Sequence, residues 1–306
     1  MPDVFRLAYV DLATASLDEA EDYYCRLLGT TVVERTSGNI YLSLGLDHHN
    51  IALCRGKEPG LNAIGLQINP NIAVAELARR LGEAGFTANL QTDARPGVAA
   101  LLEVPDVGGQ TFHLFPSITQ PAPGFAMSGI VPLRLGHIAL LSPRADEMLR
   151  LAKMLGFLET DWFDDVVTFL TCNRDHHVLN FIQAPVVGMH HIAFEMRGFE
   201  HHAQAMERLA SQKRAIEWGP SRHTAGHNVA SYHYGADRLL VEFYTEMDIF
   251  VPELGSFEPR PWHENLPQRP KRWSLEQLTA WETRYEFNLA TVAWGVKSPA
   301  PAGAPP

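Results

Sequence analysis

The sequence predicts an α+β protein of two tandem domains, each made of two βαβββ modules whose strands form a curled sheet around a pocket. Three observations predict this fold class. The chain has 306 residues, which exceeds the common size of a single domain. The sequence also matches itself at an offset of 128 residues, so that residues 6–9 align with 134–137 and Asp47-His48-His49 aligns with Asp175-His176-His177. Finally, each half alternates short apolar strands with single helices.

The two halves are expected to contain the same elements in the same order. Strands are predicted from short runs rich in Val, Ile, Leu and Phe, and helices from longer amphipathic segments that end near a glycine. In the first half, strand, helix, strand, helix and two closing strands are expected at Phe5–Leu12, Leu17–Leu28, Ile64–Ile68, Ala73–Ala84, Ala99–Val104 and Thr111–Phe115. In the second half, the six corresponding elements are expected at Leu133–Leu141, Ala145–Leu155, Ile192–Met196, Phe199–Ala210, Val229–Tyr234 and Leu239–Tyr244, and two further strands are expected after the first helix, at Val166–Thr171 and Val178–Ile182.

Proline-rich and glycine-rich segments suggest where the domains begin and end. We expect an N-terminal domain at 1–117, a linker at 118–132, a second domain at 133–247, a C-terminal loop and helix packed on the core at 248–292, and a disordered tail at 293–306. The C-terminal helix is predicted over Leu275–Ala290, because Ser274 and Gln277 form a capping box at its start.

The composition excludes several kinds of partner. Lys and Arg total 25 against 35 Asp and Glu, and the resulting net charge of -10 argues against binding to nucleic acid or to acidic lipid. No apolar run reaches the length that spans a membrane. The three cysteines form no C-x-x-C pair, which indicates a reducing compartment without a disulfide framework. We therefore expect a cytoplasmic protein.

Comparison of the two halves isolates three candidate metal ligands in the second. His137 aligns with Tyr9, and His191 aligns with Ala63, so that the first half lacks both imidazoles. Glu242 completes the set on a third predicted strand. Two imidazoles and one carboxylate that converge on one face of a metal are typical of non-heme iron(II) oxygenases, so the second half predicts one mononuclear iron site. The same ligands also suit Mn(II).

Glu242 is the most informative of the three ligands. It lies inside the apolar run Leu239–Tyr244, where an unpaired carboxylate would cost several kcal/mol, on the order of its desolvation penalty. A bound metal cation would offset this desolvation penalty by pairing with the carboxylate. Arg238 or a buried hydrogen bond is the competing explanation. The aligned residue in the first half is His113, after a slip of one position.

The second half resembles the type I extradiol ring-cleavage dioxygenases of the vicinal oxygen chelate superfamily, which have a glyoxalase-like fold. The resemblance is carried by an ordered series of motifs, namely Leu135–Leu140, Asp175-His176-His177, Met189–Phe194, Gly219–His223, Tyr232 and Glu242. It implies that His137, His191 and Glu242 are the iron ligands and that the first half is a metal-free copy. It also implies catalytic roles beside the metal for His177, His223 and Tyr232.

The resemblance implies extradiol (meta) cleavage of a catecholic aromatic by dioxygen, which gives a muconic semialdehyde-type product in aromatic catabolism. His223 and Tyr232 would hydrogen-bond the catechol oxygens, and His177 would act on the oxygen side as a general acid. The resemblance to this family further implies a homo-oligomer. We expect His227, Phe181 and Trp218 to contact the substrate, whose identity the sequence does not give.

The remaining histidines have structural explanations, and two other functions compete with ring cleavage. Strand alternation places His176 and His190 on the face opposite to their neighbours, as packing or surface residues. His201 and His202 open a predicted helix and are expected to be solvated. The alternative functions are another metal-dependent enzyme of the superfamily, of glyoxalase or epimerase type, and a non-catalytic small-molecule binding module. Neither alternative requires His177, His223 and Tyr232 together with the three ligands.

Overall fold

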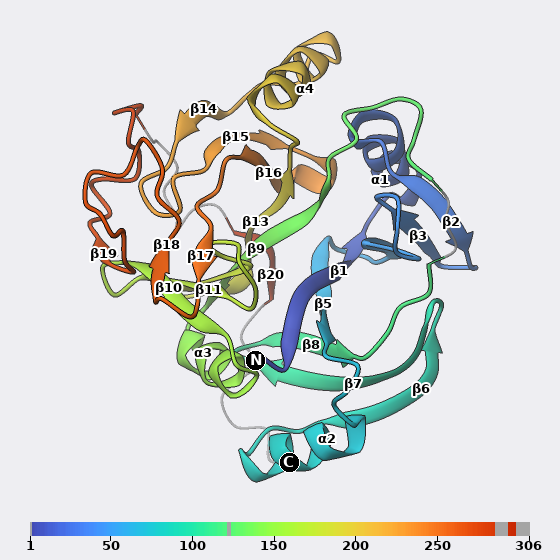
Figure 1. Ribbon diagram of the computed structural model, residues 1–306. Helices are drawn as coiled ribbons and strands as arrows, with labels where there is room; N and C mark the ends of the chain where they lie inside the picture. The colour runs from blue at the N-terminus through green and yellow to red at the C-terminus, as the bar shows by residue number, and fades with distance from the viewer. Residues whose placement is uncertain (1, 121–123, 285–292, 298–306) are drawn as a thin grey trace.

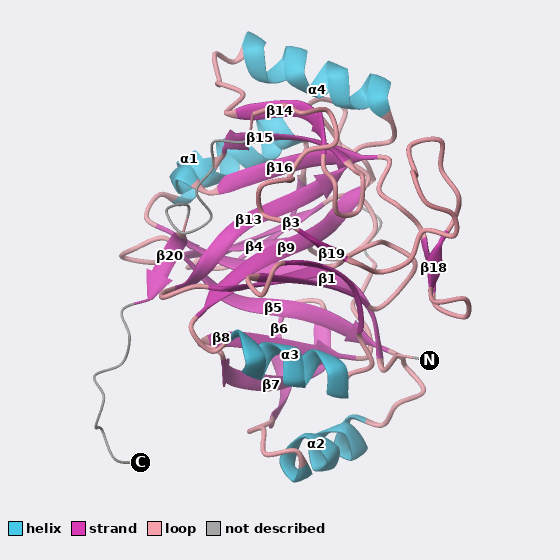
Figure 2. Ribbon diagram, turned by 90° about the vertical axis from the view of Figure 1, so that its left-hand side faces the viewer, coloured by secondary structure: helices cyan, strands magenta, loops and turns pink. Residues whose placement is uncertain are grey.

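The computed structural model describes residues 2–120, 124–284 and 293–297 and contains two large curled sheets. The first sheet has eight strands, in the order β2-β3-β4-β1-β5-β8-β7-β6, and the second has ten, in the order β14-β15-β16-β13-β9-β12-β11-β10-β19, with β20 paired to β13. The two sheets lie beside each other, with β1 next to β9, and the helices cover their outer faces (Figures 1 and 2). This arrangement is the predicted α+β fold.

Each sheet is made of two βαβββ modules, as the internal repeat predicts. The first sheet contains β1 (Val4–Thr14), α1 (Leu17–Asp22), the π-helix η1 (Tyr23–Leu28), β2 (Thr31–Arg35), β3 (Asn39–Ser43), β4 (Ile51–Arg55), β5 (Gly60–Ile68), α2 (Val74–Glu83), β6 (Asn89–Arg95), β7 (Val98–Val107) and β8 (Gln110–Phe115). The second contains β9 (Arg134–Ser142), α3 (Ala145–Met154), β10 (Leu158–Phe163), β11 (Val167–Thr171), β12 (Leu179–Gln183), β13 (Val187–Glu195), α4 (Phe199–Ser211), β14 (Trp218–Arg222), β15 (Val229–Tyr234) and β16 (Leu240–Thr245).

The chain after β16 is mostly irregular. It contains the two-residue strands β17 (Phe250–Val251), β18 (Ser256–Phe257) and β19 (Arg272–Trp273), and it returns to the second sheet with β20 (Trp294–Lys297). Because β20 pairs with β13, the prediction of a disordered tail over 293–306 is wrong for 294–297, whereas 298–306 lie outside the described residues. None of the described helices is long and apolar enough to cross a membrane.

The helices pack through one apolar face each. In α4, the buried residues are His202, Ala205, Met206 and Leu209, which recur at the spacing of one helix face. His202 was expected to be solvated, and that prediction is wrong, because its Nε2 lies 2.8 Å from the Ser231 hydroxyl beneath the helix. One continuous apolar cluster contains residues of both halves, so the two sheets share a core that holds them in a fixed relation.

The predicted helix Leu275–Ala290 does not form over the described residues 275–284. Ser274 does begin a turn, with its hydroxyl accepting the Glu276 N–H at 3.2 Å. The backbone then extends, because it pairs with the end of β14 and the residues just after it. The Thr224 N–H donates to the Leu278 carbonyl at 3.2 Å, and the Ala280 N–H donates to the Arg222 carbonyl at 2.7 Å. These tertiary hydrogen bonds replace the helical ones. Residues 285–290 lie outside the described part of the chain.

Candidate metal centre

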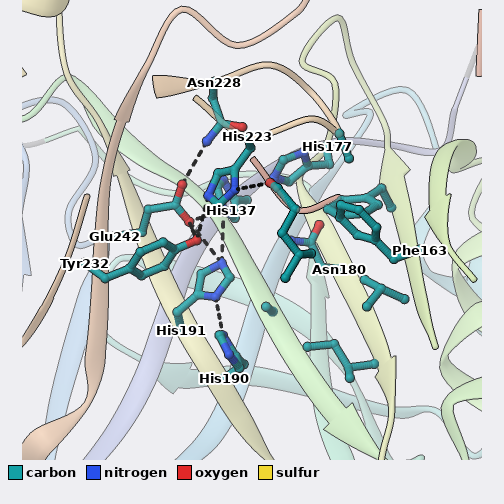
Figure 3. A pocket seen from close by; sticks show the side chains of 16 residues that line it. His137, Phe163, His177, Asn180, His190, His191, His223, Asn228, Tyr232 and Glu242 are labelled. Atoms are coloured by element: carbon teal, nitrogen blue, oxygen red, sulfur yellow. Dashed lines mark hydrogen bonds and ion pairs between the residues drawn. The ribbon is translucent and has the colours of Figure 1, made fainter. Parts of the chain in front are cut away.

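The three predicted ligands lie on adjacent strands at the concave face of the second sheet. β13 lies between β9 and β16, and Ala193 of β13 is paired with His137 on one side and with Glu242 on the other. His191 precedes Ala193 by two residues and therefore projects from the same face of β13. The two imidazoles and the carboxylate turn toward one another in the pocket (Figure 3).

The three ligand atoms form an equilateral triangle. Nε2 of His137 and Nε2 of His191 are 3.2 Å apart, and each lies 3.2 Å from Oε2 of Glu242. Ligands on one face of an octahedral ion with bonds of a little over 2 Å are separated by about 3 Å, so these side chains fit a single divalent cation. All three side chains are buried.

The surroundings of Glu242 keep it ionised. Burial alone would raise its pKa, but the imidazoles of His137 and His191 oppose burial and lower the pKa to about 2. The Tyr232 hydroxyl donates to Oε2 of Glu242 at 2.9 Å, and the Asn228 amide donates to Oε1 at 2.9 Å. These two hydrogen bonds, one to each oxygen, therefore hold the carboxylate in one orientation. Asn228 was missed by the sequence analysis, because nothing in its flanking residues distinguishes it.

The structure places His177, His223 and Tyr232 around the three ligands. The His177 ring lies 4.2 Å from the His137 ring, measured between centroids, and Nε2 of His223 lies 3.2 Å from the Tyr232 hydroxyl. Burial lowers the pKa of His177 well below its usual value, and the neighbouring imidazoles lower it further. Burial also lowers the pKa of His223. Both rings are consequently neutral imidazoles at pH 7, each with one donor and one acceptor nitrogen.

His190 faces the site, so for this residue the expectation from strand alternation is wrong, whereas His176 is buried outside the pocket lining, which agrees with the expected packing role. A register shift in the β13–β9 pairing lies between Met189 and His191, and this bulge at His190 interrupts the alternation. His190 lines the pocket, and its Nδ1 lies 2.6 Å from Nδ1 of His191. Such a contact orients the His191 ring and leaves Nε2 free for a cation. His176 lies in a loop, where no alternation applies.

Most of the rest of the pocket wall is apolar. Its lining side chains outside the histidine cluster include Phe163, Val167, Phe169, Ile182 and Leu278. No lysine or arginine stands among the described residues that line it. Alternation along β12 turns Asn180 and Ile182 into the pocket. A catechol-sized ligand would therefore meet polar groups at one end and apolar side chains elsewhere.

None of the three residues expected to contact substrate is part of this wall. Phe181, between Asn180 and Ile182, packs in the apolar core on the other face of β12. Trp218 lies behind His223, with the two rings stacked at 5.0 Å. His227 hydrogen-bonds Asp248 at 2.7 Å and lines a neighbouring cavity. Phe181 was expected on the face of β12 that lines the pocket, but its side chain lies on the opposite face.

A second cluster of potential ligands, His227, Asp248 and His263, is explained by hydrogen bonds. Nδ1 of His263 accepts the Arg260 N–H at 3.2 Å, so its Nε2 carries the proton and donates to Asp248 at 2.9 Å. Nδ1 of His227 lies 2.7 Å from the other Asp248 oxygen. The buried carboxylate is satisfied by these donors and needs no cation.

In the first half, an arginine occupies the place that corresponds to the metal centre. The Tyr9 hydroxyl lies 2.9 Å from Nδ1 of His113, and the Arg95 guanidinium lies 4.2 Å from the Tyr9 ring centroid. Arg95 also pairs with both oxygens of Asp11 at 2.6 Å. The guanidinium supplies a positive charge among these groups, which opposes the binding of a cation there.

The family follows from a comparison with known proteins. Residues 6–243 match the family model described as the Glyoxalase/Bleomycin resistance protein/Dioxygenase superfamily. The chain belongs to this superfamily. The match covers most of both halves, and it confirms the membership and the glyoxalase-like fold that the sequence motifs predict.

Individual relatives are distant. The chain is 25% identical to the 1,2-dihydroxynaphthalene dioxygenase of Sphingobium xenophagum over 216 residues, which are 64% of this chain and 72% of that protein. It is 22% identical to the metapyrocatechase of Geobacillus stearothermophilus over 297 residues, which are 89% of this chain and 90% of that protein. Among solved structures, the Mn(II)-bound glyoxalase from Novosphingobium aromaticivorans superposes with a TM-score of 0.80 at 24% identity and covers 92% of each chain.

Proposed function

We propose that this protein is a metal-dependent dioxygenase that opens the ring of a catechol beside its two hydroxyl groups, with Fe(II) bound by His137, His191 and Glu242. The observation that carries the proposal is the 3.2 Å triangle of ligand atoms in a pocket that also contains His177, His223 and Tyr232. Two relatives with dioxygenase chemistry, named 1,2-dihydroxynaphthalene dioxygenase and metapyrocatechase, support it.

The bound metal would supply Lewis acidity toward the two adjacent catechol oxygens and electrons for the activation of dioxygen. Three ligands from the chain leave part of the coordination sphere to these partners. The chain's own residues would then orient the ring. The Tyr232 hydroxyl and Nε2 of His223 point at one edge of the centre, where they can donate to or accept from a phenolic oxygen.

His177 is positioned to accept or donate a proton on another side of the metal centre. Its ring stands against His137, and burial keeps it neutral, so that one nitrogen can take a proton while the other keeps a hydrogen bond. Phe169, whose ring lies 5.0 Å from that of His177, shields this side from water. We assign His177 the role of the acid–base residue of ring cleavage.

A glyoxalase-type reaction is the second candidate, because the Mn(II)-bound glyoxalase has a similar fold. That similarity is below 25% identity and reflects the fold alone. The trio His177, His223 and Tyr232 favours the dioxygenase, because an isomerisation of a thiol adduct does not require it. A binding module without catalysis would have no reason to bury an ionised Glu242 beside two imidazoles.

The apolar wall predicts which catechols the enzyme accepts. With no lysine or arginine among the described lining residues, a substrate carboxylate would be buried without a partner. We expect 4-methylcatechol or 1,2-dihydroxynaphthalene to be cleaved with a kcat/KM at least about 100-fold higher than that of 3,4-dihydroxyphenylacetate. The measurement is the absorbance of the ring-opened product for each compound under air.

The methyl ester of 3,4-dihydroxyphenylacetate is the matched control ligand, because it removes the charge and keeps the shape. Its kcat/KM should rise to near that of the neutral catechols. Equal rates for the acid and its ester would contradict the apolar pocket. If no catechol in the panel gives a ring-opened product, the dioxygenase assignment itself is wrong.

A further inference from the structure

A chain of buried hydrogen bonds runs from His177 away from the metal centre. Nδ1 of His177 lies 2.9 Å from Nδ1 of His176, and Nε2 of His176 lies 3.0 Å from Oδ2 of Asp161. The His176 and Asp161 side chains are 0% and 1% exposed, so water does not compete for these contacts. The two nitrogens of His176 are thus both engaged. His177 lines the pocket (Figure 3), where its Nε2 is the nitrogen not used in this chain.

The surroundings of Asp161 fix the direction of its hydrogen bond with His176. Trp273 Nε1–H donates to Oδ2 of Asp161 at 2.7 Å, and the Lys271 backbone N–H donates to Oδ1 at 2.8 Å. Both groups are donors only, and a carboxylate is an acceptor only. The contact with His176 must therefore be a donation from its Nε2–H. In the neutral ring, Nδ1 of His176 is then an acceptor.

The tautomer of His177 follows when the His176 ring is neutral. Because Nδ1 of His176 accepts, Nδ1 of His177 must carry the proton and donate. Its Nε2 is then unprotonated, with a lone pair available to the pocket. The other tautomer would place two lone pairs against each other 2.9 Å apart in a buried site, which is unfavourable.

We propose that Asp161 and His176 are positioning residues that hold His177 with the lone pair of Nε2 toward the metal centre. The inference rests on the proposed function, since it assigns the state in which His177 meets a bound catechol or oxygen ligand. An imidazole held this way accepts a hydrogen bond or proton from the ligand, rather than donating one at first contact.

The C-terminal segment supplies the parts that hold this chain of contacts. β19 pairs with β10 and brings Trp273 and Lys271 to Asp161. The Phe257 ring stacks on His176, with centroids 5.1 Å apart and planes at 21°. Phe257, Lys271 and Trp273 therefore act on the site without lining it. This gives the segment a role beyond packing on the core.

The first half contains a corresponding pair that serves as an internal control. Nδ1 of His48 lies 3.1 Å from Nδ1 of His49, and Nε2 of His48 lies 3.2 Å from Glu34. The Glu34 side chain is 44% exposed, and His49 faces Arg95 at 3.2 Å instead of a metal centre. Replacing His48 therefore removes a similar buried ring without touching the proposed site.

The test compares His176→Phe with His176→Asn in the full-length protein. Phenylalanine keeps a planar ring among aromatic neighbours but removes the acceptor, whereas asparagine retains an amide oxygen close to the position of Nδ1. We expect His176→Phe to lower kcat by about 10- to 100-fold, with KM and metal content nearly unchanged, and His176→Asn to recover most of the loss. His48→Phe should leave kcat unchanged.

A second readout does not depend on turnover. Long-range ¹H–¹⁵N correlation spectra of the protein loaded with diamagnetic Zn(II) report the tautomer of each histidine, and His177→Asn identifies the His177 signal. We expect Nδ1–H with an unprotonated Nε2 in the wild type and in His48→Phe, and a shifted tautomer in His176→Phe. A wild-type His177 with Nε2–H, or a His176→Phe variant with unchanged kcat and tautomer, overturns the proposal. Failure of every catechol to react overturns the proposed function, and the spectra then still decide the tautomer.

Discussion

Replacing His191 with alanine is expected to abolish tight metal binding and to lower catechol cleavage by about 1,000-fold or more, a larger effect than the loss of a supporting contact. The substitution removes one corner of the 3.2 Å triangle and leaves only His137 and Glu242. Two side chains fix neither the position of a cation nor its open sites. Metal content after anaerobic loading and gel filtration, measured by elemental analysis, checks the result together with oxygen uptake.

The matched control for this prediction is His113→Ala in the first half. His113 is the counterpart of Glu242 and contacts Tyr9 and Arg95 rather than a metal. Its loss should leave one metal per chain and full activity. A His191→Ala protein that keeps both its metal and its activity would show that the ligand assignment is wrong.

Replacing His177 with asparagine is expected to lower kcat by about 10²- to 10⁴-fold while metal content and catechol affinity stay close to wild type. The reason is that His177 lies beside the ligands, with its ring 4.2 Å from that of His137, and supplies none of the three ligand atoms. Asparagine keeps a hydrogen-bonding group near Nδ1 but cannot take up a proton. Single-turnover kinetics with preloaded catechol separate this effect from binding.

His49→Asn provides the corresponding control, since His49 aligns with His177 but sits beside Arg95. It should leave kcat unchanged. Loss of metal from His177→Asn would mean that this residue is a ligand rather than an acid–base group. An unchanged kcat would remove His177 from the reaction.

Much of the fold could be predicted because the sequence contains it twice. The offset of 128 residues fixes which strands correspond, and the predicted bounds of Val229–Tyr234 coincide with β15. The ligand set emerged for the same reason: Tyr9 and Ala63 mark the positions at which only the second half has an imidazole. An internal copy here supplies the comparison that one sequence otherwise lacks.

The errors arise where tertiary contacts override a local pattern. The bulge at His190 breaks the alternation that was used to turn this side chain away from the site. The segment 275–284 has a good capping residue but pairs with residues 222–224, so the helix does not form there. Asn228 holds Glu242 through one long-range hydrogen bond, and Asp161 acts through two neighbours. Neither contact leaves a periodic or spacing signal in the sequence.

The most direct test of the central assignment is the stoichiometry of oxygen uptake. Full-length protein loaded anaerobically with Fe(II) is mixed with a limiting amount of 4-methylcatechol in an oxygen electrode, and the product is identified by mass spectrometry under ¹⁸O₂. We expect one dioxygen consumed per catechol, no hydrogen peroxide, and a ring-opened product that contains both labelled atoms. Oxygen consumption that yields peroxide and a quinone, or no consumption at all with a fully metal-loaded protein, would contradict ring cleavage at His137, His191 and Glu242.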